Sequence, residues 1–173
     1  EYNPAYCRII TLRAARYHLA LPVLNAAGET LPLPTGAFDA IVCWDVIEHV
    51  QSPDRVLAEM SRVLRPGGVA LVTAINRRAW IDPHYHMRGI NWLPRPLAEA
   101  LIARRGRGKQ GAAFRDMQRL SAMHYFDYGE FVALAARHGF ATRDLREELL
   151  REGKLHSPKP LRRATRTLLR AAR

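Results

Sequence analysis

The sequence of residues 38–75 is FDAIVCWDVIEHVQSPDRVLAEMSRVLRPGGVALVTAI. Its two ends, 38–44 and 69–75, are mostly apolar runs that favour strands covered on both faces. Ser52 and Pro53 begin a helix between them. The apolar side chains of this helix recur on one face: Val56, Leu57, Met60, Val63 and Leu64. Pro66-Gly67-Gly68 ends the helix, so the segment predicts a βαβ unit with parallel strands.

The flanking segments fit the same α/β class. Asn3 and Pro4 begin a predicted helix over 4–19, and residues 21–24 form a short apolar stretch that we expect to be a buried strand. Prolines make 31–36 irregular. Residues 128–138 predict a helix that ends at Gly139, with a strand starting at 140–142.

The segment between these parts breaks the pattern. Residues 76–125 hold three prolines and two tryptophans, with a predicted helix over 97–103. An insertion of this length usually forms a lid or a binding element. We therefore divide the chain into a partial core (1–78), an insertion with the acceptor site (79–125), the last core helix and strand (126–150) and a basic C-terminal tail (151–173). Residues 160–173 predict a basic, weakly amphipathic helix or a frayed end.

Composition excludes several classes. The chain has 173 residues, of which 48% are hydrophobic and 25% charged, which indicates one domain and excludes disordered, collagen-like and integral membrane proteins. Two distant cysteines, Cys7 and Cys43, give no disulfide framework, so we expect a cytoplasmic location. The chain begins with Glu1 and no signal segment follows, so we expect processing or the tail of a longer chain.

The net charge of +11 is unevenly distributed. Residues 101–173 carry 17 Lys and Arg against seven Asp and Glu. Such a basic half suggests contact with phosphate, either on nucleic acid or on an anionic membrane surface. Only three of the 27 cations are lysine, so coding bias in the source genome explains the same excess. We expect nucleic acid not to be the partner, and leave a peripheral membrane contact through the tail open.

In an open parallel sheet, ligands bind beyond the carboxyl ends of the strands. Three such ends are visible, at 27–29, 43–49 and 73–78. Glu1 suggests a fourth, because a carboxylate between an upstream strand and a helix can accept hydrogen bonds from the two ribose hydroxyls of a nucleoside.

These residues resemble a known family. The run GETLPLPTGAFDAIVC (28–43), the run DVIEHV (45–50) and VLRPGG (63–68) before an apolar strand resemble class I S-adenosylmethionine-dependent methyltransferases. Asn76-Arg77 is similar to the type 11 and quinone-biosynthesis O-methyltransferase branch. The resemblance covers about residues 1–78 and implies a Rossmann-like, doubly wound, mostly parallel sheet whose first strand and helix are missing, with a helical insertion.

The resemblance implies S-adenosylmethionine as cofactor. It places Glu1 at the ribose, Tyr2 against the adenine, Ala27, Gly28 and Glu29 at the adenine edge, and Cys43 and Trp44 near the methionine. Two features depart from the family pattern. The glycine-rich turn that precedes the ribose carboxylate is not in these residues, and Ala27 replaces an aspartate that often contacts the adenine.

Asp45, Glu48 and His49 lie on one face if a helix or turn begins at Asp45. Three interpretations stay open: a Mg²⁺ site, His49 as a general base on an acceptor hydroxyl, or a loop brace. We take His49 as the catalytic candidate and expect no metal. The acceptor-site candidates follow: Asn76, Arg77, Trp80, His84 and Tyr85.

We therefore predict a methyltransferase for a small-molecule, lipid-linked or glycan-linked acceptor, methylated at a hydroxyl. The chain as given is expected to be inactive if it is truncated. Three alternatives stay open: a non-catalytic interaction domain of the same fold, a nicotinamide-dependent Rossmann enzyme, and a nucleic-acid methyltransferase.

Overall fold

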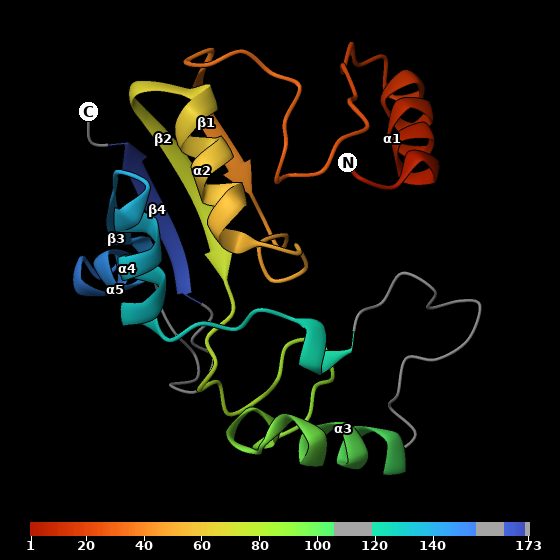
Figure 1. Cartoon of the computed structure of the whole chain (residues 1–173), viewed down its shortest axis with the longest axis vertical. Helices are drawn as coiled ribbons and strands as arrows, with labels where there is room; N and C mark the ends of the chain where they lie inside the picture. Colours follow the sequence, from red (N-terminus) through yellow and green to blue (C-terminus); the bar gives the residue numbers. More distant parts are fainter. Residues whose placement is uncertain (106–118, 155–164, 172–173) are drawn as a thin grey trace.

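The computed structural model describes residues 1–105, 119–154 and 165–171 (Figure 1). Its strands are β1 (Phe38–Cys43), β2 (Leu64–Ala74), β3 (Phe140–Asp144) and β4 (Thr165–Ala171). Its helices are α1 (Pro4–Arg16), α2 (Pro53–Val63), α3 (Arg95–Arg104), α4 (Tyr128–Arg137) and α5 (Leu145–Arg151), with 3₁₀ turns at Ile90–Trp92 and Leu120–Ala122.

The four strands form one sheet in the order β1-β2-β4-β3. β1 pairs in parallel with β2, and α2 connects them, which confirms the predicted βαβ unit. β4 runs antiparallel to both of its neighbours, so β2 and β3 point the same way. The main core lies between the sheet and helices α2 and α4, around Leu57, Val72 and Phe131. The doubly wound arrangement stays a prediction.

The crossover from α2 to β2 follows from local chemistry. The Ser52 side chain accepts a hydrogen bond from the Arg55 N–H and so caps α2. β2 begins at Leu64, five residues before the predicted strand, because Leu64 already pairs with Phe38; the register then shifts across residues 65–68, and regular pairing continues from Val69. Gly67 has φ +77°, and a Cβ on Gly68 would lie 2.9 Å from the Arg65 carbonyl oxygen. Glycine is therefore required at both positions.

Two sequence predictions are wrong. Residues 21–24 form no strand, since Pro22 removes a donor and both Leu21 and Leu24 stay exposed. The C-terminal segment was predicted to be an amphipathic helix or a frayed end, and residues 165–171 are neither. These residues form β4, inside the sheet, so the last core strand lies within the predicted basic tail. The rest of that tail, 155–164 and 172–173, lies outside the described residues.

The β1 side of the molecule exposes much apolar surface. Among the described strands β1 pairs only with β2, and Val42 on β1 is 69% exposed. α1 stands apart from the sheet in Figure 1, with Ile9 and Leu12 exposed although they recur at helical spacing. Within the described part of the chain, nothing covers these side chains.

The insertion forms a second, smaller core below the carboxyl ends of β1 and β2 (Figure 1). This core contains Tyr85, Met87, Ile90, Ala98, Ile102, Leu120, Met123 and Tyr125. The predicted helix over 97–103 is confirmed as α3. Across the helices of the described residues, no run combines the length and apolarity needed to cross a bilayer.

A carboxylate and a guanidinium hold the irregular loop 31–35 against α2. Arg62 donates to the carbonyl oxygens of Leu31 and Leu33, and Glu59 accepts from the Leu31 N–H at 2.7 Å and from Arg62. These hydrogen bonds, chiefly those from Arg62, lower the pKa of Glu59 to about 2.

We expect Glu59→Gln to destabilise the chain at neutral pH. Because the folded-state pKa of Glu59 lies below its usual value of 4.5, its contribution is complete above that pH and is lost as the pH falls toward about 2. Urea unfolding midpoints should therefore differ between the two proteins at pH 7 and converge at low pH. Asp39→Asn is the control, because its pair with Arg65 is exposed and should change the midpoint little. A pH-independent difference for Glu59→Gln would contradict this assignment.

Candidate active site

The carboxyl ends of β1 and β2 are joined by side-chain hydrogen bonds. The Asp45 N–H donates to Thr73 Oγ1 at 2.6 Å, and the Thr73 hydroxyl donates back to Asp45 Oδ1 at 2.9 Å. Asp45 has φ +53°, a left-handed conformation that aspartate tolerates better than most residues. The Asp45 carboxylate is thus bound to β2, which separates it from the predicted set with Glu48 and His49.

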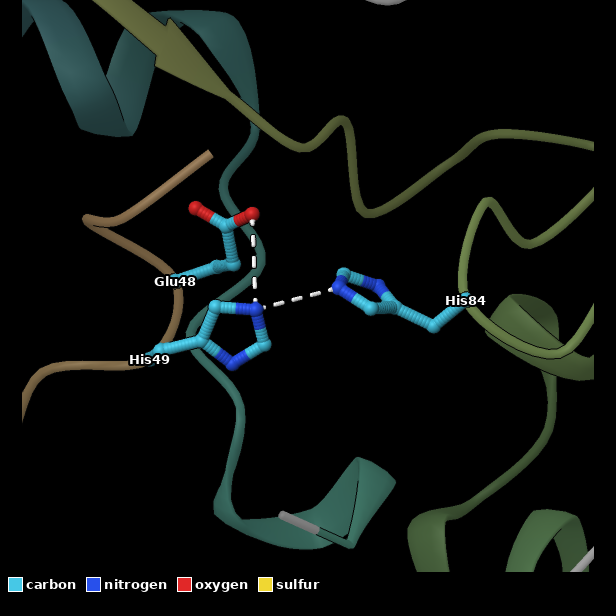
Figure 2. Close-up of side chains that lie close together, drawn as sticks. All are labelled: Glu48, His49 and His84. Atoms are coloured by element: carbon cyan, nitrogen blue, oxygen red, sulfur yellow. Dashed lines mark hydrogen bonds and ion pairs between the residues drawn. The ribbon is translucent and has the colours of Figure 1, made fainter. Parts of the chain in front are cut away.

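A different set of three side chains converges next to it (Figure 2). Nε2 of His49 lies 3.2 Å from Nε2 of His84 and 3.8 Å from Oε1 of Glu48. All three ligand atoms lie within 4.8 Å of one another. Glu48 and His49 follow β1, whereas His84 comes from the insertion, 35 residues further along the chain. The cluster therefore joins the core to the insertion.

A chain of hydrogen bonds fixes the tautomer of His84. Tyr125 donates its hydroxyl proton to Oδ2 of the buried Asp82 at 2.8 Å. The same hydroxyl oxygen lies 3.0 Å from Nδ1 of His84. Since a phenol has one proton and this one goes to the carboxylate, Nδ1 of His84 must be the donor. In the neutral ring Nε2 then carries a lone pair, directed at His49 and Glu48.

Glu48 is buried without full compensation. Its side chain is 1% exposed, and Oε2 has no hydrogen-bond partner among the described residues. Burial raises the pKa of Glu48, and the charge of Asp45 raises it further. The hydrogen bond from the Glu48 backbone N–H and the charge of His49 lower it, and their effect is smaller. The Glu48 carbonyl oxygen accepts from the His124 N–H, which ties the end of the insertion to this loop.

Asp82 organises the loop that carries His84. Its Oδ1 accepts from the N–H groups of His84 at 2.9 Å and Tyr85 at 2.7 Å, an Asx-type turn. The Arg95 guanidinium lies 4.9 Å from the centre of the Tyr125 ring. Burial first, and then the charge of Asp82, raises the pKa of Tyr125, so its hydroxyl keeps its proton.

The other predicted acceptor residues lie apart from the cluster. Arg77 donates to the Tyr125 carbonyl oxygen and pairs with Glu130, and Asn76 forms a β-bridge with Phe126, so both close the base of the insertion. Tyr85 is buried in the insertion core. The Trp80 ring lies 5.0 Å from the Trp92 ring, centre to centre.

The predicted cofactor residues of the N-terminal segment gather around one loop. The Glu1 N–H group donates to the Leu24 carbonyl oxygen, and the Ala26 N–H donates to the Glu1 carbonyl oxygen, each at 3.0 Å. These two bonds run in the pattern of a parallel pair of strands. Glu1 and Tyr2 are exposed, and no bridge joins them to β1 within the described residues. Ala27 and Gly28 follow directly and are partly exposed.

Glu29, Cys43 and Trp44 differ in what their side chains can contribute. Glu29 Oε1 accepts from the N–H groups of Gln51 and Ser52, so this carboxylate braces the loop before α2. Burial raises the pKa of the Cys43 thiol to about 12, which keeps it protonated. Trp44 is exposed at the end of β1.

Asp82 and Tyr125 were not predicted from the sequence. The run Asp82-Pro83 signals a turn, but nothing in the linear order pairs it with Tyr125, 43 residues away. The sequence did single out His84, as an acceptor-site residue rather than as a neighbour of His49.

Comparison with known proteins shows what this chain is similar to. Residues 1–72 match the model of a family described as a methyltransferase domain. The resemblance to class I S-adenosylmethionine-dependent methyltransferases is confirmed. S-adenosylmethionine is the cofactor that this family implies. The matched residues contain Glu48 and His49, whereas Asp82, His84 and Tyr125 lie outside them.

Relatives include both carbon and oxygen methyltransferases. The ubiquinone/menaquinone biosynthesis C-methyltransferase of Bordetella parapertussis is 34% identical over 95 residues, which cover 54% of this chain and 37% of the relative. The ubiquinone biosynthesis O-methyltransferase of Xanthomonas oryzae pv. oryzae is 40% identical over 43 residues, 25% of this chain and 18% of that enzyme. This chain thus spans less than half the length of these relatives.

Solved structures support the fold. An S-adenosylmethionine-dependent methyltransferase of Thermotoga maritima superposes with a TM-score of 0.57 at 18% identity, over 99% of this chain and 71% of that one. One from Methanosarcina mazei gives 0.56 at 16% identity, over 98% and 77%. This chain therefore has the expected Rossmann-like α/β fold.

We expect Tyr125→Phe to lower the free energy of unfolding by about 1–3 kcal/mol, because it leaves an oxygen of the buried Asp82 carboxylate without its donor. Urea denaturation measures this. Tyr128→Phe is the matched control, since that tyrosine is exposed and should change stability by less than about 0.5 kcal/mol. Equal effects of the two substitutions would contradict the assigned hydrogen bonds.

Proposed function

We propose that the chain forms the acceptor side and part of the cofactor side of a methyltransferase that acts on a hydroxyl of a small molecule, free or linked to a lipid or glycan. The Glu48–His49–His84 cluster carries this proposal. It lies where the residues that match the family meet an insertion that the match does not include. A methyl acceptor would bind between the two.

The reaction needs alignment and a place for one proton. The acceptor oxygen attacks the methyl carbon of the sulfonium in line with the leaving sulfur, forms the O–CH₃ bond, and releases S-adenosylhomocysteine as the C–S bond breaks. The hydroxyl proton must leave during this step. His49 is proposed to accept this proton. Its side chain is 37% exposed, so that an acceptor molecule could reach it, and its Nε2 lies beside His84 and Glu48.

The cofactor residues are proposed from the family resemblance. The exposed Glu1 carboxylate is proposed to bind the ribose hydroxyls, and the exposed Tyr2 to lie on the adenine. Ala27 and Gly28 adjoin Glu1 through the Ala26–Glu1 hydrogen bond and are proposed to border the adenine through their backbone. Cys43 is buried, so its contribution near the methionine would come from its backbone.

A hydroxyl acceptor is favoured by the chemistry of the cluster. The named relatives include a C-methyltransferase and an O-methyltransferase of quinone biosynthesis, so they do not choose between carbon and oxygen. Two imidazoles beside a buried carboxylate can accept and retain the proton that a hydroxyl releases. Arg77, Trp80 and Tyr85 then shape the base and core of the insertion that would cover the acceptor.

We expect Glu1→Gln to weaken S-adenosylhomocysteine binding about tenfold, since a neutral amide accepts the ribose hydroxyls less strongly than a carboxylate. Isothermal titration calorimetry on the chain measures this. Glu152→Gln is the control, because that exposed carboxylate pairs with Lys154 away from the proposed site. Unchanged affinity for Glu1→Gln would remove Glu1 from the cofactor site.

We expect His49→Gln to lower the turnover number for methyl transfer to a phenolic hydroxyl by about 10²–10⁴-fold, the usual contribution of a positioned base. The affinity for S-adenosylhomocysteine should not change. His138→Gln is the matched control, because that histidine bonds Asp54 far along the chain from the cluster. A His49→Gln protein with full turnover would exclude His49 as the base.

A further inference from the structure

The geometry points to a divalent transition-metal site made by Glu48, His49 and His84. Two nitrogens that each lie about 2.1 Å from one cation at an angle of about 100° are about 3.2 Å apart. The observed distance between the two Nε2 atoms is 3.2 Å. Oε1 of Glu48 lies 3.8 Å from Nε2 of His49 and within 4.8 Å of Nε2 of His84, so the carboxylate would turn toward the two imidazoles when an ion binds.

A second observation points to the same ligand. Oε2 of Glu48 has no hydrogen-bond partner among the described residues, although the side chain is 1% exposed. A hydrogen bond between the two imidazoles would explain their separation but would not compensate the charge of the buried Glu48 carboxylate. A cation between the three side chains would compensate the buried carboxylate. It would also use the lone pairs of both imidazoles.

The surrounding groups prepare His84 as a ligand. A ligating histidine usually donates its other ring N–H to an oxygen, which fixes the tautomer and orients the ring. Nδ1 of His84 donates to Tyr125, and Tyr125 in turn donates to Asp82. Asp82 also holds the His84 backbone through Oδ1. The lone pair on Nε2 is therefore directed into the cluster before any ion binds.

Charge and ligand type define the class of ion. The charged groups that act on Glu48 and Tyr125 include the carboxylates of Asp45 and Asp82 and the guanidinium of Arg95. Two imidazoles with one carboxylate favour Zn²⁺, Fe²⁺, Mn²⁺ or Co²⁺ over Mg²⁺ and Ca²⁺, which prefer oxygen ligands. Three protein ligands leave a coordination position open.

The site differs from the one that the linear sequence suggested. Asp45 is held by Thr73 and is replaced by His84. His84, Tyr125 and Asp82 all come from the insertion, beyond the residues that match the methyltransferase family. The site is thus a property of this chain's insertion rather than of the matched family core.

The role of the ion rests on the proposed function, whereas the site itself does not. A hydroxyl bound at the open position would lose its proton more readily. His49 would then serve as a ligand instead of a free base. The proton would pass to solvent, and the oxygen would attack the sulfonium methyl as described above.

Zn²⁺ binding to the chelator-treated chain tests the site. Calorimetry should give one tight site per chain, and Co²⁺ should give the visible absorption of a low-symmetry complex with nitrogen ligands. His84→Gln and Glu48→Gln should each weaken Zn²⁺ binding about 100-fold, and Tyr125→Phe about tenfold. His86→Gln is the matched control, since this exposed histidine lies two residues from His84 outside the cluster. Circular dichroism establishes that each variant is folded.

The outcomes separate the two proposals. Wild-type binding no tighter than that of folded His84→Gln, or an equal loss in His86→Gln, overturns the site. Tight Zn²⁺ binding without S-adenosylhomocysteine binding supports the site and counts against the proposed function. Methyl transfer at the full rate in metal-free protein overturns the ion's part in the reaction. A rate that falls at least tenfold on chelation and returns with Zn²⁺ or Mn²⁺ supports it.

Discussion

The parallel pairing of β1 with β2 is the constraint on which the rest of the structure depends. Parallel strands end at the same edge of the sheet, so the residues after each strand meet there. Asp45 and Thr73 join the two ends by hydrogen bonds. Because Glu48 and His49 follow β1 and the insertion follows β2, both enter the same region of space (Figure 1).

Hydrogen bonds between buried polar groups hold the insertion together and join it to the core. Asp82 is fully buried, and its two oxygens accept from Tyr125 and from the backbone of its own turn. The hydrogen bond from His124 to the Glu48 carbonyl oxygen then fixes the other end. Low dielectric strengthens such bonds and makes each missing partner costly. This is why the unpartnered Oε2 of the Glu48 carboxylate is informative.

Local sequence patterns predicted the elements whose signals are local. The apolar face and the Ser52-Pro53 start predicted α2, and the apolar run after Pro66-Gly67-Gly68 predicted β2 apart from its first residues. The prediction failed where pairing at long range decides. Among the described residues, 21–24 form no strand, although the Leu24 carbonyl oxygen accepts from Glu1, whereas the arginine-rich 165–171 pair between β2 and β3.

The sequence alone determined the family resemblance and half of the candidate site. The runs 28–43, 45–50 and 63–68 established the methyltransferase resemblance, and they single out Glu48 and His49, because adjacent residues share a loop in any conformation. Only the tertiary structure decided that His84 completes the cluster and that Asp45 leaves it. Contacts across 35 residues depend on how the insertion folds, and hydrogen bonds from Tyr125 and Asp82 set the ring's direction, which spacing along a chain does not encode.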